Sequence, residues 1–205
     1  DATSMDLHLY GVANGATGPR IVVAATAEPE GAADLDVFGD GSVIVVWEAP
    51  SGDGSGFAVL GRRFLSDGTA ASDAFVVTSE TSGDQRDPVV AVLGSDEFVV
   101  TYRNAQAKVA QRRLTKAGKP AGGKLEHLAN QWTAGEQSQL AAAGQPDGNR
   151  AMLVWSGPVA GLDGLEVRAR VLDKNGKPTG AEFGVNKTTA DSQSAPAIAA
   201  RPITR

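Results

Sequence analysis

The stretch Val43-Ile44-Val45-Val46-Trp47 decides the fold, because it recurs twice further along the chain. The second copy is Phe98-Val99-Val100-Thr101-Tyr102 and the third is Ala151-Met152-Leu153-Val154-Trp155. Each copy is a short apolar run that ends in a large aromatic residue, and the aromatic residues stand at positions 47, 102 and 155. Such regular self-similarity, at a period of about fifty residues, indicates a repeat architecture in which one supersecondary unit is copied along the chain.

Each copy belongs to a longer unit of four predicted strands. A strand with an arginine follows the aromatic run, then a turn with glycine, a third strand and a glutamine, and an apolar strand begins the next unit. The arginines are Arg63, Arg113 and Arg170; the turns are Asp67-Gly68, Ala117-Gly118 and Asn175-Gly176; the third strands are Phe75-Val76-Val77, Leu125-Glu126-His127 and Phe183-Gly184-Val185; the glutamines are Gln85, Gln137 and Gln193; and the apolar strands start at Pro88, Leu140 and Pro196. Asp-Gly and Asn-Gly are strong signals for tight hairpin turns. Three full units therefore cover residues 32–85, 86–137 and 138–193.

The two ends of the chain both fall inside a unit. Residues 7–15 match the arginine strand with its turn, 21–23 match the third strand, and 196–199 match the apolar strand that opens a unit. A propeller closes its ring when strands from both ends share one blade. We therefore expect a single all-β domain, residues 1–205: a β-propeller of four-stranded antiparallel blades, four in number, whose closing blade combines 1–31 with 194–205. The closing blade would lack one strand, so we expect either a three-stranded blade or a piece of a longer protein.

The composition fits this architecture and excludes several partners. The chain has 25 Gly, 10 Pro and only 5% aromatic residues, which is typical of short strands joined by tight turns. The net charge of -5 comes from interspersed charges of both signs, so a nucleic-acid partner is not expected. Without cysteine there is no disulfide or thiolate site. No run approaches the roughly 20 apolar residues of a membrane span, and residues 1–4 show no leader pattern, which suits a mature or excised chain.

The motifs of the units resemble a known kind of repeat. They include Pro88 to Ala91, Val43 to Trp47, Asp53-Gly54-Ser55-Gly56, Arg63-Phe64, Glu182-Phe183-Gly184-Val185-Asn186 and Gly83-Asp84-Gln85. In this order they are similar to the repeats of about fifty residues found in large secreted or surface proteins of bacteria. The resemblance covers almost the whole chain and implies propeller architecture and an extracellular, cell-surface or periplasmic setting, but no ligand. The second unit lacks the Asp-Gly-Ser-Gly loop.

No catalytic site can be identified. The two histidines, His8 and His127, have no partner residue in the sequence that acid–base chemistry would require, and His127 aligns with Val77 and Val185 of the sister units. Residues 118–124 match the first part of a phosphate-binding loop, but Leu125 follows instead of Ser or Thr and no helix is expected there. We interpret this segment as the hairpin turn of the second unit, with Lys119 and Lys124 in solvent. No cofactor is expected.

Two acidic features are candidates for cation binding. The loop Gly52-Asp53-Gly54-Ser55-Gly56, with Asp163-Gly164 at the matching place, offers oxygen ligands for calcium, although calcium takes six to eight oxygens and each loop has one Asp. The alternative is a turn that needs glycine. Asp34 and Asp36 interrupt an otherwise apolar strand and could line the channel mouth, facing a cation or a basic group of a partner.

The aromatic residues separate the functional hypotheses. Trp47, Tyr102 and Trp155 occur in every unit, which favours packing between blades over sugar stacking. Trp132 lies in a loop and is unrepeated, so it is the best single hint of a contact surface.

The first functional hypothesis is a non-enzymatic interaction or scaffold module that binds a protein, as a subunit or fragment of a larger assembly. The alternative is a lectin-like propeller that binds surface glycans, and the third is a hydrolase or lyase. Arg63, Arg113 and Arg170 are expected to pair with carboxylates or to cover blade edges.

Overall fold

The chain is all-β in the computed structural model, which describes residues 3–10, 17–26, 30–122, 126–145, 147–162, 164–188 and 190–200. These residues form three antiparallel sheets of four strands and one sheet of two, and none of them is helical. Each predicted unit is one sheet, in which consecutive strands pair as neighbours. Within the described residues no helix is long and apolar enough to cross a membrane.

We call the three four-stranded sheets blades 1, 2 and 3. Blade 1 is β3 (Ala33–Val37), β4 (Val43–Pro50), β5 (Phe57–Phe64) and β6 (Phe75–Val76). Blade 2 is β7 (Arg86–Leu93), β8 (Glu97–Arg103), β9 (Val109–Thr115) and β10 (His127–Leu128). Blade 3 is β11 (Ser138–Gly144), β12 (Arg150–Pro158), β13 (Leu165–Asp173) and β14 (Pro178–Gly184). The two-stranded sheet is β1 (Thr3–Tyr10) and β2 (Thr17–Thr26).

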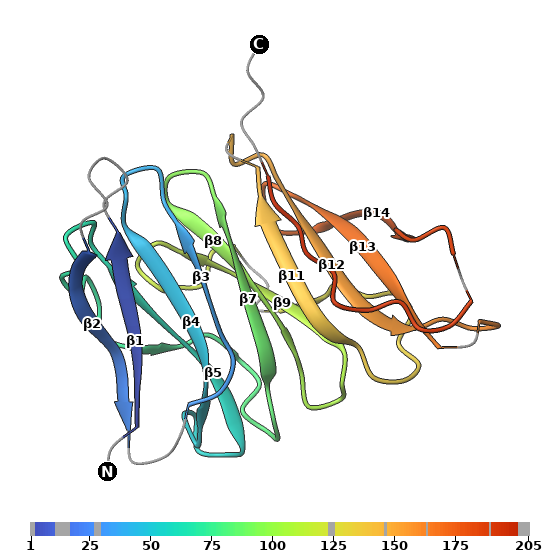
Figure 1. The fold of residues 1–205 in the computed structure, drawn as a ribbon, viewed down its shortest axis with the longest axis horizontal. Helices are drawn as coiled ribbons and strands as arrows, with labels where there is room; N and C mark the ends of the chain where they lie inside the picture. Colours follow the sequence, from blue (N-terminus) through green and yellow to red (C-terminus); the bar gives the residue numbers. More distant parts are fainter. Residues whose placement is uncertain are drawn as a thin grey trace.

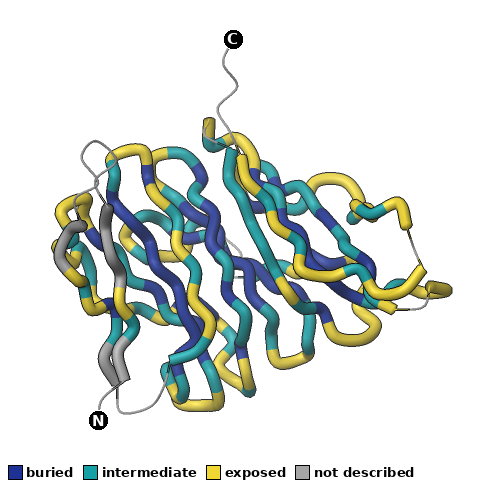
Figure 2. The backbone as a smooth tube through the Cα atoms, in the orientation of Figure 1, coloured by how far each residue is buried: buried dark blue, intermediate teal, exposed yellow. Residues whose placement is uncertain are grey.

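The sheets follow one another like the blades of a propeller, with the first strand of each blade beside that of the next (Figure 1). A separate apolar core fills each junction. Val46 and Val59 of blade 1 meet Phe98 of blade 2, Val99 of blade 2 meets Leu153 of blade 3, and β1–β2 packs on blade 1. Because β4 and β8 contact a neighbouring sheet on both faces, they are apolar almost throughout, unlike a sheet with one face in water. Figure 2 shows the buried residues concentrated in these strands.

The turns between the third and fourth strands are those that the sequence predicts. Gly68, Gly118 and Gly176 have φ of 86°, 75° and 69°, a region that glycine enters without steric cost. Pro120 forms an isolated bridge with Leu114 just after the second of these turns. The hairpin interpretation of residues 118–122 is therefore confirmed, whereas Lys124 lies outside the described residues.

The repeated arginine joins each blade to the one before it. Arg62 donates to the backbone oxygen of Val23 at 3.1 Å, and Arg170 donates to that of Ala129 at 2.7 Å. Arg112 donates in the same way to Val77. These three arginines pair with the residue two places before the aromatic of their blade, which makes them the true equivalents. The predicted set of Arg63, Arg113 and Arg170 was wrong by one position in the first two units, because adjacent arginines in β5 and β9 point to opposite faces.

The repeated glutamine ties two loops of its blade together. The backbone N–H groups of Gln85, Gln137 and Gln193 donate to Phe57, Ala107 and Leu165, which lie at or just before the start of the third strand of the same unit. Each side-chain amide donates to a backbone oxygen three residues earlier, at 3.2–3.3 Å. The residue two places after each glutamine has a positive φ, namely Asp87 at 55°, Gln139 at 52° and Ala195 at 54°. The segment that follows Gln193 thus keeps the backbone geometry that opens a blade.

The described residues do not show the predicted closing blade. Residues 3–10 and 17–26 do pair as two strands, as expected, but 196–199 is not a strand and lies against blade 3 rather than beside β1. The ring closure expected from the sequence is therefore absent from the described residues. Ala195 donates instead to the side-chain oxygen of Gln139, at 2.8 Å.

The fourth strand of blade 2 also differs from the prediction. His127 pairs with Gln111, as Phe75 pairs with Gly61 and Phe183 with Ala169. His127 is therefore equivalent to Phe75 and Phe183, and the alignment with Val77 and Val185 was wrong by two positions. Ala129 takes the place of those valines. The cause is the sequence Leu125-Glu126-His127, whose apolar start imitates the start of a strand that begins two residues later.

Candidate functional site

One repeat position distinguishes the junction between blades 2 and 3 from the junction between blades 1 and 2. In blade 1, Gly61 and Phe75 are cross-strand partners whose side-chain positions face blade 2. In blade 2, the same partners are Gln111 and His127, and they face blade 3. A polar pair thus replaces a glycine and a phenylalanine at an otherwise apolar place. We call the space beside this pair the blade 2–3 groove.

At the junction of blades 1 and 2, Phe75 fills the available space. A Cβ atom on Gly61 would lie 2.9 Å from the ring of Phe75, so the ring rests directly on the glycine backbone. A Cβ atom on Gly118, in the hairpin turn of blade 2, would lie 2.7 Å from the same ring. The ring is therefore packed between Gly61 and Gly118. The turn of blade 2 closes over an apolar side chain and leaves no room for a ligand.

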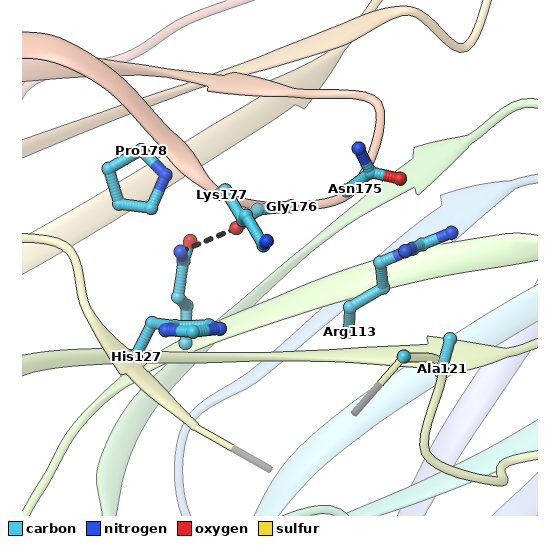
Figure 3. A pocket seen from close by; sticks show the side chains of 9 residues that line it. Arg113, Ala121, His127, Asn175, Gly176, Lys177 and Pro178 are labelled. Atoms are coloured by element: carbon cyan, nitrogen blue, oxygen red, sulfur yellow. Dashed lines mark hydrogen bonds between the residues drawn. The ribbon is translucent and has the colours of Figure 1, made fainter. Parts of the chain in front are cut away.

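At the junction of blades 2 and 3, the equivalent turn stands over an open pocket of ≈730 Å³. Gln111, which is buried, donates its side-chain amide to the backbone oxygen of Gly176 at 2.6 Å. The backbone of Gly176 packs on the stem of Arg113, since a Cβ atom there would lie 3.3–3.4 Å from the Cβ and Cδ atoms of Arg113. Figure 3 shows Arg113 and His127 of blade 2 around one opening with Asn175, Lys177 and Pro178 of blade 3.

The charged groups of the groove differ in how far their polar atoms are hydrogen-bonded within the chain. Arg113 donates from Nε and Nη2 to the carboxylate of Glu97, which leaves Nη1 without a hydrogen-bond partner in the described part of the chain. Asp173 is held by the turn, because it accepts the N–H groups of Asn175 and Lys177 at 2.8 and 2.9 Å. Burial raises the pKa of Asp173, but the hydrogen bonds from Lys177 and Asn175 outweigh it and hold the pKa below its ordinary value. Lys177 is exposed, and the buried side-chain oxygen of Gln111 has no hydrogen-bond donor among the described residues.

The aromatic residue that ends the apolar run in the second strand of each blade is buried. Trp47, Tyr102 and Trp155 have 0–1% exposure and belong to the three junction cores. The Trp155 indole donates to the side-chain oxygen of Gln137 at 3.0 Å. This confirms the prediction of packing between blades. None of the three is accessible for stacking on a sugar.

Asp34 and Asp36 serve the backbone of the next blade. Asp34 accepts the N–H of Val90 at 2.9 Å and Asp36 accepts the N–H of Val92 at 2.7 Å, so both carboxylates bind the free edge of β7. Burial raises the pKa of Asp34, and the hydrogen bond from Val90 only partly offsets it. The channel-mouth hypothesis predicts that these carboxylates face a cation or a basic group of a partner. In the structure they accept hydrogen bonds from backbone N–H groups of their own chain.

The remaining candidates do not converge on one site. Asp53 accepts the N–H of Ser55 at 3.2 Å within its loop, while Asp163 lies outside the described residues, so the calcium hypothesis stays a prediction. No group of three or more His, Asp or Glu residues suited to a metal occurs in the described segments. His8 lies in β1 opposite Arg20, and its side chain is outside the described part.

The backbone of Trp132 is hydrogen-bonded to blade 3. Its backbone N–H donates to the carboxylate of Glu182 at 3.1 Å, its backbone oxygen accepts from Asn130, and Glu182 also pairs with Arg168. The side chain is 37% exposed, so this loop presents an aromatic surface from a fixed backbone.

Gln111 and Lys177 of the groove were not identified as candidate site residues from the sequence. A correct alignment of Gln111 with Gly61 and Ala169 would have shown it as the exception at its repeat position.

Comparisons with known proteins give no identity. Neither a protein-family profile nor a curated protein matches the sequence. Among solved structures, a protein of unknown function from Dyadobacter fermentans is 16% identical with a TM-score of 0.45, over 69% of this chain and 39% of that one. A subtype N10 neuraminidase-like protein of A/little yellow-shouldered bat/Guatemala/060/2010 is 11% identical, TM-score 0.47, over 78% and 45%. The GH93 alpha-L-arabinofuranosidase of Fusarium graminearum is 13% identical, TM-score 0.44, over 82% and 55%. The chain thus spans about half or less of these structures, and similarities this low give no information about activity.

Proposed function

We propose that this chain is a non-enzymatic interaction module of an extracellular or cell-surface protein, and that the outward face of blade 3 is its docking surface for a β-sheet. One observation carries the proposal. Val77 and Ala129, at the same place in blades 1 and 2, are 0% exposed, whereas Val185 in blade 3 is 52% exposed. Phe183 beside it is 44% exposed. The face of blade 3 has the residues of an inter-blade interface, and no sheet of the described residues covers Phe183 and Val185.

The other junctions define the chemistry of the missing partner. Each covering blade offers an apolar strand that ends in an aromatic residue, and an arginine that donates to the backbone of the blade before it, at Val23, Val77 and Ala129. Val185 is next in this series. Residues 198–200 already lie beside Met152 and Val171, so a partner sheet would cover the outer part of the face. The occupant is therefore a sheet of the same repeat chemistry, which would continue the ring that the sequence predicts.

The alternatives have less support. A lectin-like site built on the repeated aromatic residues would need Trp47, Tyr102 or Trp155 at the surface, and they are buried. A hydrolase would need a nucleophile or paired carboxylates beside a base in one pocket. In the described residues around the blade 2–3 groove, His127 has no such neighbour. An interaction module accounts for the same features without catalytic groups.

The oligomeric state of the isolated chain tests the proposal. A second copy is a source of such a sheet, so the wild-type chain should self-associate at about 100 μM or above, a range expected for a weak interface. The double variant Phe183→Asp/Val185→Asp should be monomeric in light scattering at the same concentration, because it puts charge on the face. Leu65→Asp, at a residue with 40% exposure in the hairpin turn of blade 1, is the matched control and should associate like wild type.

Two results would contradict the proposal. One is a wild-type chain that stays monomeric up to about 500 μM, since a weak interface would be populated there. The other is equal loss of association in Leu65→Asp and in the double variant. Circular dichroism and the urea midpoint of each variant show whether the fold is retained.

A further inference from the structure

The blade 2–3 groove has a composition that packing does not explain. Blade 1 has an apolar side chain on a small residue at this place, namely Phe75 on Gly61. Blade 3 has the same arrangement, with Phe183 opposite Ala169. Only blade 2 combines Gln111 with His127, and only at its junction does the turn of the next blade stand over an open pocket. A polar pair that lines a pocket at a place where the fold prefers phenylalanine suggests a bound ligand.

The unused polar atoms around the groove favour an anion. The Nη1 nitrogen of Arg113 has no acceptor among the described residues, and it points toward Gly122, where a Cβ atom would lie 3.8 Å away. Lys177 adds a second cation on the opposite wall, and it is exposed. Of the two carboxylates beside the groove, Glu97 pairs with Arg113, and Asp173 is bound by the backbone of the turn and also interacts electrostatically with Lys177. A guanidinium edge and an ammonium group are standard partners of a carboxylate.

The volume of the pocket and the charges around it limit the class of ligand further. The pocket of ≈730 Å³ is far larger than an inorganic ion and lies within the usual range of small-molecule sites, about 300–1,000 Å³. Pro178, the imidazole ring of His127 and the stem of Arg113 give apolar contact for an organic body. Because Glu97 offsets the charge of Arg113 and Asp173 offsets part of the charge of Lys177, a single negative charge suits the groove better than a phosphate dianion.

We propose that the blade 2–3 groove binds a small organic carboxylate, with the carboxylate between Arg113 and Lys177 and the body of the ligand against His127 and Pro178. Acidic saccharides and the free carboxyl terminus of a peptide both present this group. The groove is separate from the outward face of blade 3. Failure of either proposal therefore leaves the other standing.

The sequence supplies a matched control for the central residue. The turns Lys116-Ala117-Gly118-Lys119-Pro120 and Lys174-Asn175-Gly176-Lys177-Pro178 have nearly the same sequence and the same place in their blades. Lys119 stands at the junction that Phe75 fills, whereas Lys177 stands at the open groove. Lys177→Met should therefore weaken carboxylate binding, and Lys119→Met should not.

The experiment is a titration followed by NMR shifts of backbone amides. The probes are glucuronate and N-acetylalanine, with glucose and N-acetylalanine amide as neutral counterparts and sulfate as an inorganic anion. At least one carboxylate should saturate with Kd of about 1–10 mM, the affinity expected of one charge-assisted contact pair, and its neutral counterpart should bind about tenfold more weakly. Which carboxylate binds more tightly distinguishes the saccharide from the peptide source. The shifts should centre on Gln111, His127 and Gly176.

The variants decide whether the groove is the site. Lys177→Met should raise Kd about fivefold or more, as expected for loss of one charged contact, while Lys119→Met leaves it unchanged. The double variant Gln111→Gly/His127→Phe recreates the filled junction and should abolish the shifts while keeping the urea midpoint at or above that of wild type. The proposal is overturned by equal binding of neutral and charged probes, by sulfate binding as tightly as the carboxylates, by absence of saturation at about 100 mM, or by equal effects of the two lysine variants.

Discussion

Two junctions of the molecule are built from the same repeat but are packed differently: the one between blades 1 and 2, and the one between blades 2 and 3. In the first, Phe75 lies on Gly61 and the turn at Gly118 closes over its ring. In the second, His127 lies opposite Gln111, and the turn at Gly176 is held above a pocket by one hydrogen bond from Gln111. The backbone pairing is the same in both. Two side chains decide whether the junction is solid or open.

The two junctions also differ between their innermost strands, β3, β7 and β11, which lie nearest the propeller axis. There the first junction is the polar one and the second is the closely packed one. At the first junction, Asp34 and Asp36 reach across to the N–H groups of β7, so carboxylates bridge the inner strands. At the second, Gly144 of β11 approaches the backbone oxygen of Val92 so closely that no side chain fits between them. The first junction is thus polar at the axis and apolar outside, and the second is closely packed at the axis and polar outside. A repeat fold tolerates either arrangement because each junction is a separate core.

The largest expected effect comes from truncating the side chain that differs. Phe75→Ala should lower the free energy of unfolding by about 2–4 kcal/mol, since it removes a partly buried ring from a packed cluster. His127→Ala at the same repeat position should cost less than about 1 kcal/mol, because His127 borders a pocket that water can already enter. Urea unfolding followed by tryptophan fluorescence measures both. Equal losses would show that the two junctions are packed alike.

The second effect separates crowding from backbone strain. Gly118→Ala and Gly176→Ala both place a side chain at positive φ, 75° and 69°, which costs about 1–2 kcal/mol in each turn. The Gly118 variant also places a methyl group 2.7 Å from the ring of Phe75, and overpacking adds about 1–3 kcal/mol. At Gly176 the nearest atom is the Cβ atom of Arg113, which is 3.3 Å away. Gly118→Ala should therefore be the more destabilising by thermal unfolding, and the reverse order would contradict the comparison.

Much of this architecture could be predicted from the sequence, because the repeat is a local pattern. The apolar runs at 43–47, 98–102 and 151–155, the glycine turns and the glutamines lie in the same order in every sheet. Burial of Trp47, Tyr102 and Trp155 followed from their recurrence. The number of strands per blade was right for the same reason.

The errors arose where side-chain direction or long-range packing decides. Alternate residues of a strand point to opposite faces, so a shift of one position exchanged Arg112 for Arg113, and these residues have different partners. A correct alignment would have shown Gln111 as an exception, but the groove itself could not be foreseen, because Lys177 and His127 are 50 residues apart and meet only when two blades pack. Ring closure is not shown by the described residues, and it depends on pairing between the two ends of the chain, which a local repeat pattern does not describe.

The smallest expected effect tests the polar axis of the first junction. Burial raises the pKa of Asp34, so the folded chain holds this proton more tightly than the unfolded chain, whose carboxyl has a pKa near 3.8. The charged carboxylate is therefore slightly destabilising at neutral pH, and wild-type stability recovers this loss as the pH falls through the raised pKa toward 3.8. Asp34→Asn keeps an oxygen for the N–H of Val90 and has no charge to desolvate. It should be more stable than wild type at pH 7.5, by less than about 1 kcal/mol because the site is partly exposed to solvent. The difference should vanish below pH 3.8 in urea titrations of the two proteins. An advantage that persists at low pH would mean that packing, rather than charge, distinguishes the two side chains.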